Sequence, residues 1–194
     1  MMKPSLLLYI HGFNSSPQSL KANVMKTFCE QSRPDIKVIT PQISCFPEDA
    51  KQLLLDIVEQ YKDDYQIGLV GSSLGGYMST WLNSLYGFSA VVVNPAVRPY
   101  ELLQDYLGEQ TNPYTNETYT LQQKHVEQLR SLDVVTLTDP ADFWLLQQEG
   151  DEVLDYRQAV DKFSESKQTV EKGGDHSFVG FDRYPEQIIN FLGL

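Results

Sequence analysis

The chain has 194 residues, of which 41% are hydrophobic and 21% charged, so it suits one domain with a substantial core and is not an intrinsically disordered protein. Its formal net charge of -11 argues against nucleic-acid and anionic-membrane partners, because no basic stripe is present to neutralise phosphates. Only two cysteines occur, Cys29 and Cys45, with no histidine near either, so we expect two reduced thiols and no metal site.

Short apolar segments with strand character alternate along the chain with amphipathic segments of helical spacing. The predicted strands are residues 5–10, 37–40, 66–70, 90–94, 143–147 and 168–171. The predicted helices are residues 19–31, 48–61, 74–86, 155–165 and 185–192. Several strands are apolar throughout, which is typical of a sheet that is buried on both sides. We therefore expect an α/β fold over residues 1–194, with a mostly parallel sheet of about six strands and helices on both faces.

One connection interrupts this alternation. Residues 96–139 contain no obvious strand but two helical patterns, 100–107 and 121–132, on either side of the turn-rich segment 108–114. A long insertion after a strand commonly acts as a lid or a pocket wall. We therefore expect a small helical, cap-like insertion at residues 96–139.

The chain carries no pattern typical of export or of a membrane span. The apolar run at residues 6–10 is too short for a signal-peptide core and is followed at once by His11 and Gly12. No other stretch approaches the length of a membrane-spanning helix. We expect a cytoplasmic protein without a membrane partner, and a monomer is the default expectation.

The segment Gly71-Ser72-Ser73-Leu74-Gly75 follows an apolar strand directly and precedes a helical pattern. This G-x-S-x-G arrangement is the nucleophile elbow of serine hydrolases, in which a tight strand-to-helix turn exposes the central serine. Neighbours two residues away must be small, which explains Gly71 and Gly75. A simple Ser/Gly turn is the alternative, but the flanking strand and helix favour Ser73 as a nucleophile.

A serine nucleophile needs a base, and the chain has only three histidines. In α/β-hydrolases the order along the chain is serine, acid, histidine. His176 follows the last predicted strand in a glycine-containing loop, so we prefer it over a reading as a surface histidine. His125 lies in a polar helical stretch and is expected to be solvated. His11 precedes the nucleophile, and its expected role is to shape the loop after the first strand.

The acid should follow the next-to-last strand. Asp151 comes after Gly150 at the expected place and is the preferred candidate. Asp155 is the rival, but its position suits the N-cap of the following helix. Glu152 is expected to be a solvated neighbour of Asp151.

Two backbone N–H groups are expected to form the oxyanion hole, which stabilises the tetrahedral intermediate. They belong to Leu74, directly after the nucleophile, and to Phe13, in the loop after the first strand. Asn14 is a further candidate. An ordinary strand-end turn at Gly12 is compatible with the same geometry.

Arg98 follows the fourth predicted strand, near the expected active-site edge. It is a candidate for binding a carboxylate or phosphate of the substrate, since arginine recognises these groups in a bidentate manner. The alternative, which we prefer, is an ion pair with Glu101 or Asp105. Aromatic residues of the insertion are candidates for an acyl pocket, although ordinary packing is the commoner role of such residues: Tyr100, Tyr106, Tyr114 and Tyr119.

Several long stretches of the chain resemble the YqiA-like esterases of bacteria, a family of small α/β-hydrolases. The stretches are Tyr9-Ile10-His11-Gly12-Phe13-Asn14-Ser15-Ser16-Pro17, the elbow, residues 91–99, residues 144–160 and Gly173-Gly174-Asp175-His176-Ser177-Phe178. The resemblance implies hydrolysis of short acyl esters, and of fatty acyl-CoA thioesters as a further substrate class. Carried over by position, it implies a triad of Ser73, Asp151 and His176, with a small-molecule ester or thioester as substrate. It implies no metal and no organic cofactor.

Two other functions stay open at this stage. A ligand-binding or sensing protein can retain a hydrolase scaffold without catalysis, because a fold does not by itself determine a function. An enzyme with the same triad can also cleave a thioester or a small amide, since the acyl-transfer chemistry is shared.

Overall fold

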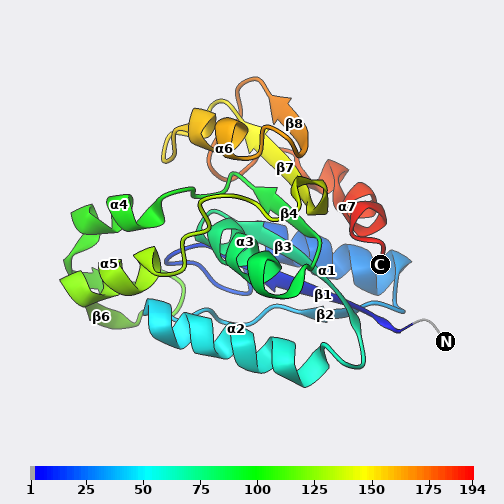
Figure 1. Ribbon diagram of the computed structural model, residues 1–194, viewed down its shortest axis with the longest axis horizontal. Helices are drawn as coiled ribbons and strands as arrows, with labels where there is room; N and C mark the ends of the chain where they lie inside the picture. Colours follow the sequence, from blue (N-terminus) through cyan, green and yellow to red (C-terminus); the bar gives the residue numbers. More distant parts are fainter. Residues whose placement is uncertain (1–2) are drawn as a thin grey trace.

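The computed structural model of the protein describes residues 3–194. Its main sheet consists of β1 (Ser5–Ile10), β2 (Lys37–Ile39), β3 (Gln66–Ser72), β4 (Ala90–Val93), β7 (Phe143–Gln148) and β8 (Lys167–Glu171). These strands lie in the order β2-β1-β3-β4-β7-β8, and every neighbouring pair is parallel (Figure 1). The predicted parallel sheet of about six strands is therefore confirmed.

Helices cover both faces of this sheet, as predicted. One face packs against α2 (Pro47–Tyr61), α3 (Leu74–Tyr86) and α6 (Tyr156–Lys162). The other face packs against α1 (Leu20–Ser32) and α7 (Pro185–Leu192). Strand β1 shows why both faces need cover: Leu6 and Leu8 enter one core, whereas Leu7 and Tyr9 enter the other. Within residues 3–194, no helix combines the length and apolar character required for crossing a membrane.

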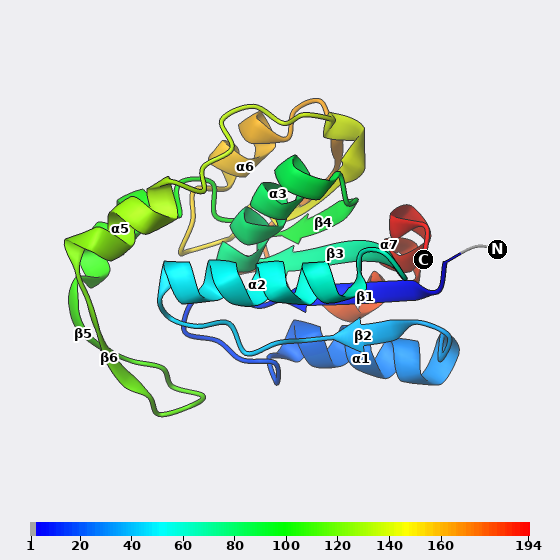
Figure 2. The ribbon, with the colours of Figure 1, turned by 60° about the horizontal axis from the view of Figure 1, so that its bottom comes forward.

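The segment 96–139 is not purely helical, so the sequence-based prediction was wrong in part. It contains α4 (Pro99–Leu103), a 3₁₀ turn (Gln104–Tyr106), the hairpin strands β5 (Gly108–Thr111) and β6 (Thr118–Leu121), and α5 (Gln123–Arg130). The strands pair antiparallel and extend away from the main sheet (Figure 2). The overlooked signal was the alternation in β6, where Tyr119 and Leu121 are buried and the intervening threonines are exposed.

The topology places several loops at one edge of the sheet. In a parallel sheet the carboxyl ends of all strands lie on the same side. Strand β2 lies on one side of β1, whereas β3 lies on the other side. The order in which strands are added to the sheet therefore reverses at β1 and β3. Ligands of open α/β sheets bind at such switch points. The loop with Phe13 and the turn with Ser73 follow these two strands.

Candidate active site

Ser73 occupies a strained turn between β3 and α3. Its φ and ψ angles are 54° and -119°, a combination that a non-glycine residue rarely adopts. The flanking glycines permit this turn. A Cβ atom on Gly75 would lie 1.8 Å from the carbonyl oxygen of Ile10, and one on Gly71 would lie 2.2 Å from the carbonyl oxygen of Gly75. The local sequence therefore accounts for the position of Ser73, half-buried at the start of α3.

Asp151 and His176 form a close pair, although 25 residues separate them in the sequence. Nδ1 of His176 lies 3.0 Å from Oδ1 and 2.9 Å from Oδ2 of Asp151. The Asp151 side chain is fully buried, and its Oδ1 also accepts the N–H groups of Val153 and Leu154, each at 2.9 Å. This fixed carboxylate selects the tautomer with a proton on Nδ1, which leaves Nε2 able to accept a proton.

The residues next to Asp151 have different contacts. Asp155 caps α6, where its Oδ1 accepts the N–H of Arg157 at 3.1 Å. Glu152 is exposed, but its Oε2 accepts the backbone N–H of His176 at 3.0 Å, a contact that the sequence did not suggest. Of the three acidic residues, only Asp151 contacts the imidazole ring.

Ser73 and His176 line one cavity of about 290 Å³, together with Gly12 and Phe13. Among the hydrogen bonds of residues 3–194, none joins the Ser73 hydroxyl to His176. Catalytic hydrogen bonds are often long without substrate and shorten when it binds. The two side chains therefore border the same cavity.

Phe13 and Leu74 lie near the same serine: Leu74 follows Ser73 in the chain, and Phe13 lines both cavities that Ser73 lines. Within the described part of the chain, neither backbone N–H group donates a hydrogen bond to a protein acceptor. Asn14 has a φ angle of 50°, and its side-chain oxygen accepts the hydroxyl of Tyr119 from the hairpin. This contact ties the loop after β1 to the 96–139 segment.

Two buried amides, which sequence reasoning missed, hold the His176 loop. Asn94 donates to the carbonyl oxygens of Asp175 (2.9 Å) and His176 (3.1 Å). Its Oδ1 accepts the N–H of Gln148 at 2.9 Å. The Gln148 side chain accepts the N–H groups of Asp175 and Val179. The only available signal was an asparagine and a glutamine at the carboxyl ends of β4 and β7.

Substitution of Asn94 by alanine is expected to lower the free energy of unfolding by about 3 kcal/mol, because buried partners lose their hydrogen bonds. Alanine is also less tolerant than asparagine of the φ angle of 40° at this position. Urea denaturation measures the change. Asn190→Ala, at an exposed position of α7, is the matched control. Equal urea midpoints for the two variants would contradict this role of Asn94.

The other two histidines are buried, away from the pair. His11 donates from Nδ1 to the carbonyl oxygen of Gly12 at 2.8 Å and accepts the N–H of Ile43 at Nε2. The expectation of a solvated His125 was wrong. Its Nδ1 accepts the N–H of Gln122, and its ring lies 4.9 Å from that of Phe46, because α5 packs against α2. Burial lowers the pKa of both imidazoles.

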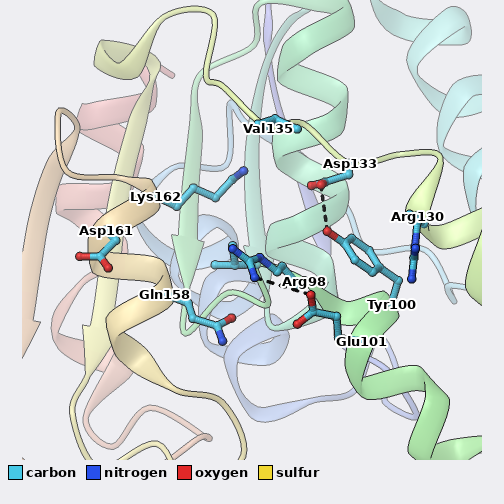
Figure 3. A pocket seen from close by; sticks show the side chains of 10 residues that line it. Arg98, Tyr100, Glu101, Arg130, Asp133, Val135, Gln158, Asp161 and Lys162 are labelled. Atoms are coloured by element: carbon cyan, nitrogen blue, oxygen red, sulfur yellow. Dashed lines mark hydrogen bonds and ion pairs between the residues drawn. The ribbon is translucent and has the colours of Figure 1, made fainter.

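Arg98 lies outside the two cavities that Ser73 lines. It borders a separate cavity of about 960 Å³ between α4 and α6, where Lys162, Asp133 and Tyr100 also lie (Figure 3). Its guanidinium lies 3.6 Å from the carboxylate of Glu101, and its side chain is 59% exposed. This is the ion pair that the sequence offered as the alternative to substrate binding. We therefore assign Arg98 no part in the site around Ser73.

A second cavity that Ser73 lines, of about 390 Å³, is mainly apolar. It lies under α4 and the following turn, and its wall includes Leu74, Ala96, Pro99, Leu102, Leu103 and Tyr106. Ser73 thus lies between this apolar cavity and the more polar cavity with His176. Among residues 3–194, no three histidine, cysteine or acidic side chains gather as metal ligands.

Comparison with protein families places nearly the whole chain in one group. Residues 6–193 match the profile of an uncharacterised protein family, UPF0227. A UPF0227 protein of Shewanella sp. strain MR-7 is 29% identical over 102 residues. This match covers 51% of this chain and 55% of that relative. A UPF0227 protein of Shewanella woodyi is 27% identical over 99 residues, which cover 50% of this chain and 54% of that relative. The matched part of the chain thus spans about half the length of these relatives.

Solved structures with a similar fold are α/β-hydrolases. Est1E from Butyrivibrio proteoclasticus has a TM-score of 0.77 at 16% identity, covering 99% of this chain and 88% of that chain. A putative hydrolase from Agrobacterium vitis S4 has a TM-score of 0.74 at 18% identity, covering 97% and 88%. The mouse alpha/beta hydrolase domain-containing protein 10 has a TM-score of 0.69 at 19% identity, covering 99% and 92%. At these identities the likeness shows the fold, which agrees with the predicted α/β-hydrolase architecture.

Proposed function

Because the chain belongs to the UPF0227 family, which includes the YqiA-like proteins, and has the α/β-hydrolase fold, we propose that it is a serine esterase acting through Ser73, His176 and Asp151. The observation that carries this proposal is the Asp151–His176 pair at the sheet edge where Ser73 occupies its elbow. A buried acid, an oriented imidazole and a serine that borders a cavity are the three parts that acyl transfer requires.

In the first half of the reaction, Ser73 attacks the carbonyl carbon of the ester while Nε2 of His176 takes the hydroxyl proton. Asp151 holds the proton on Nδ1 and stabilises the imidazolium without itself becoming protonated. The negative charge on the former carbonyl oxygen is stabilised by the N–H groups of Phe13 and Leu74, each worth about 3 kcal/mol in such sites. His176 then protonates the departing alcohol, and an acyl-enzyme remains.

In the second half, water replaces the alcohol. His176 takes a proton from this water as it attacks the acyl-enzyme, and returns it to Ser73 as the acid leaves. Every proton transfer uses residues of this chain. Thioesters undergo the same two steps, so the chemistry accommodates both substrate classes.

The apolar cavity beside Ser73 suits the acyl chain. Its volume of about 390 Å³ lies within the range of small-molecule sites, and most of its wall consists of leucine, proline and aromatic side chains, which suit an apolar acyl chain. The proposed substrates are therefore carboxylic esters with short to medium acyl chains.

Hydrolysis of nitrophenyl butyrate by the purified chain, together with labelling by a fluorophosphonate probe, tests the proposal. Turnover and labelling are both expected. A folded chain that is neither labelled nor active, but binds acyl ligands stoichiometrically, would contradict it and support a ligand-binding protein instead.

Leu102→Trp is expected to shift acyl selectivity, because Leu102 lines the apolar cavity and is 39% exposed at its rim. The larger side chain occupies part of the cavity. We expect the ratio of kcat/KM for nitrophenyl octanoate to that for nitrophenyl acetate to fall about tenfold. Leu85→Trp, at a 53% exposed position of α3 away from this cavity, is the control. An unchanged ratio in Leu102→Trp would place the acyl chain elsewhere.

A further inference from the structure

The loop after β1 passes directly beside the nucleophile. A Cβ atom on Gly12 would lie 3.2 Å from Cβ and 3.7 Å from Oγ of Ser73. The next residue, Phe13, lines both cavities that Ser73 lines, and its N–H group is one of the two proposed oxyanion donors. The stabilisation that this N–H group provides therefore depends on the conformation of the loop.

Backbone hydrogen bonds do not hold this loop in place. Among residues 3–194, no hydrogen bond joins the backbone of Phe13, Asn14 or Ser15 to another backbone group. Asn14 also has a φ angle of 50°, in the left-handed region that is unfavourable for residues other than glycine. Such a conformation persists only when the surrounding structure stabilises it. The loop therefore depends on contacts from side chains of other segments.

Two buried side chains of the β5–β6 hairpin donate hydrogen bonds to the loop. The hydroxyl of Tyr119, in β6, donates to Oδ1 of Asn14 at 2.5 Å. Nδ2 of Asn112, directly after β5, donates to the carbonyl oxygen of Ser15 at 3.2 Å, and this oxygen also accepts Nε2 of Gln42 at 3.2 Å. Tyr119 is 6% and Asn112 is 1% exposed. Hydrogen bonds in such a buried environment compete little with water.

Other contacts fix the two donors independently of the loop. Oδ1 of Asn112 accepts the N–H groups of Tyr114 at 2.8 Å and Thr115 at 3.3 Å, which closes the turn of the hairpin. The ring of Tyr119 packs edge-on against that of Phe46, which directly precedes α2, with 5.8 Å between the ring centroids. The hairpin is therefore anchored to the main body, and its two donors restrict the loop after β1.

We propose that Tyr119 and Asn112 are positioning residues of the oxyanion hole, which hold the loop after β1 so that the N–H group of Phe13 stabilises the tetrahedral intermediate. The inference rests on the proposed esterase function and adds the hairpin to the residues on which catalysis depends. Neither side chain lines a cavity that Ser73 lines, so each acts through the loop and not on the substrate. Their loss therefore destabilises the transition state more than the bound ester.

Tyr119→Phe removes the hydroxyl and keeps the ring that packs on Phe46. We expect kcat for nitrophenyl butyrate to fall about tenfold, which is part of the roughly 10²–10³-fold loss that follows complete removal of an oxyanion donor. The KM is expected to stay within about twofold of the wild-type value, because ground-state binding is retained. Titration with a fluorophosphonate gives the concentration of active sites, so that kcat refers to folded enzyme alone.

Inhibition by propyl trifluoromethyl ketone separates positioning from a purely structural role. The hydroxyl oxygen of Ser73 adds to the carbonyl carbon of this ketone, the proton passes to His176, and the carbonyl oxygen becomes an oxyanion like that of the tetrahedral intermediate. In Tyr119→Phe the inhibition constant should rise by the same factor, about tenfold, as kcat/KM falls. A residue that only stabilises the fold would change the melting temperature and leave this constant unchanged.

Asn112→Asp provides a second, independent variant. The aspartate keeps an oxygen for the N–H groups of Tyr114 and Thr115, so the hairpin turn is retained. It has no N–H group to donate to Ser15, and we expect kcat to fall and the inhibition constant to rise, again each about tenfold. A folding defect in one variant leaves the other informative. Tyr86→Phe is the matched control, because the Tyr86 hydroxyl donates to Glu59 and Tyr86 lies outside both cavities that Ser73 lines.

The outcomes separate this inference from the function on which it rests. Wild-type kcat and ketone inhibition in a folded Tyr119→Phe or Asn112→Asp variant overturn the positioning role and leave the esterase intact. A fall in kcat with an unchanged inhibition constant, or an equal loss in Tyr86→Phe, also overturns it, because the defect then lies outside the oxyanion hole. A folded wild-type chain that neither cleaves the ester nor binds the ketone overturns both proposals.

Discussion

Ser73→Ala is expected to reduce kcat for nitrophenyl butyrate by about 10⁶-fold and to abolish labelling by a fluorophosphonate. The reason is that no other described residue presents a hydroxyl in an elbow next to His176. The variant should still fold, because Ser73 borders two cavities and its hydroxyl makes no hydrogen bond with residues 3–194 that alanine would lose. Steady-state kinetics and gel fluorescence after labelling provide the two readouts.

Ser84→Ala is the matched control for this experiment. Ser84 lies on the same helix, α3, and its hydroxyl donates to the carbonyl oxygen of Trp81 on an exposed turn. Wild-type turnover and labelling are expected for this variant. Retention of a substantial fraction of activity in Ser73→Ala would show that the hydrolysis proceeds without this nucleophile, and the proposed mechanism would fail.

Asp151→Asn is expected to lower kcat by about 10⁴-fold with little change in stability. The asparagine oxygen can keep the hydrogen bonds from the N–H groups of Val153 and Leu154. Its amide nitrogen, however, faces Nδ1 of His176 and donates a hydrogen bond to it. The imidazole must then carry its own proton on Nε2, where it can no longer accept the proton of Ser73.

Asp155→Asn distinguishes this effect from a general loss of negative charge. It removes one carboxylate four residues away, and asparagine is as good an N-cap as aspartate. Near wild-type kcat is expected. If both variants lose activity equally, or if Asp151→Asn remains active, Asp151 does not orient the base.

Much of this architecture could be predicted from patterns in the local sequence. Strands and helices followed from hydrophobic periodicity, and α3 and α7 begin and end at the predicted residues. The elbow could be recognised because its residues form a short motif, G-x-S-x-G, in which Gly71 must leave room for the carbonyl oxygen of Gly75, although Gly75 itself must leave room for that of Ile10 in the neighbouring strand. The order of residues along the chain then indicated Asp151 and His176 as acid and base. Each follows a strand of the parallel sheet, and the carboxyl ends of parallel strands lie at the same edge.

What sequence reasoning missed depends on contacts between distant segments. The hairpin β5–β6 is mostly polar, and its pairing depends on two segments meeting across a turn. His125 looked solvated in a polar stretch, and only the packing of α5 against α2 buries it. The hydrogen bonds of Asn94 to the His176 loop have no signature in the sequence either.

The physical reason is the range over which each determinant acts. Backbone strain, amphipathic periodicity and short motifs act over a few residues, so the sequence by itself determined the strands, the main helices and the elbow at Ser73. Burial, hydrogen-bond satisfaction and cavity lining depend on which elements the sheet order β2-β1-β3-β4-β7-β8 brings together. Only the tertiary structure could therefore decide that Arg98 pairs with Glu101 outside the Ser73 cavities, and that polar and apolar cavities meet at Ser73.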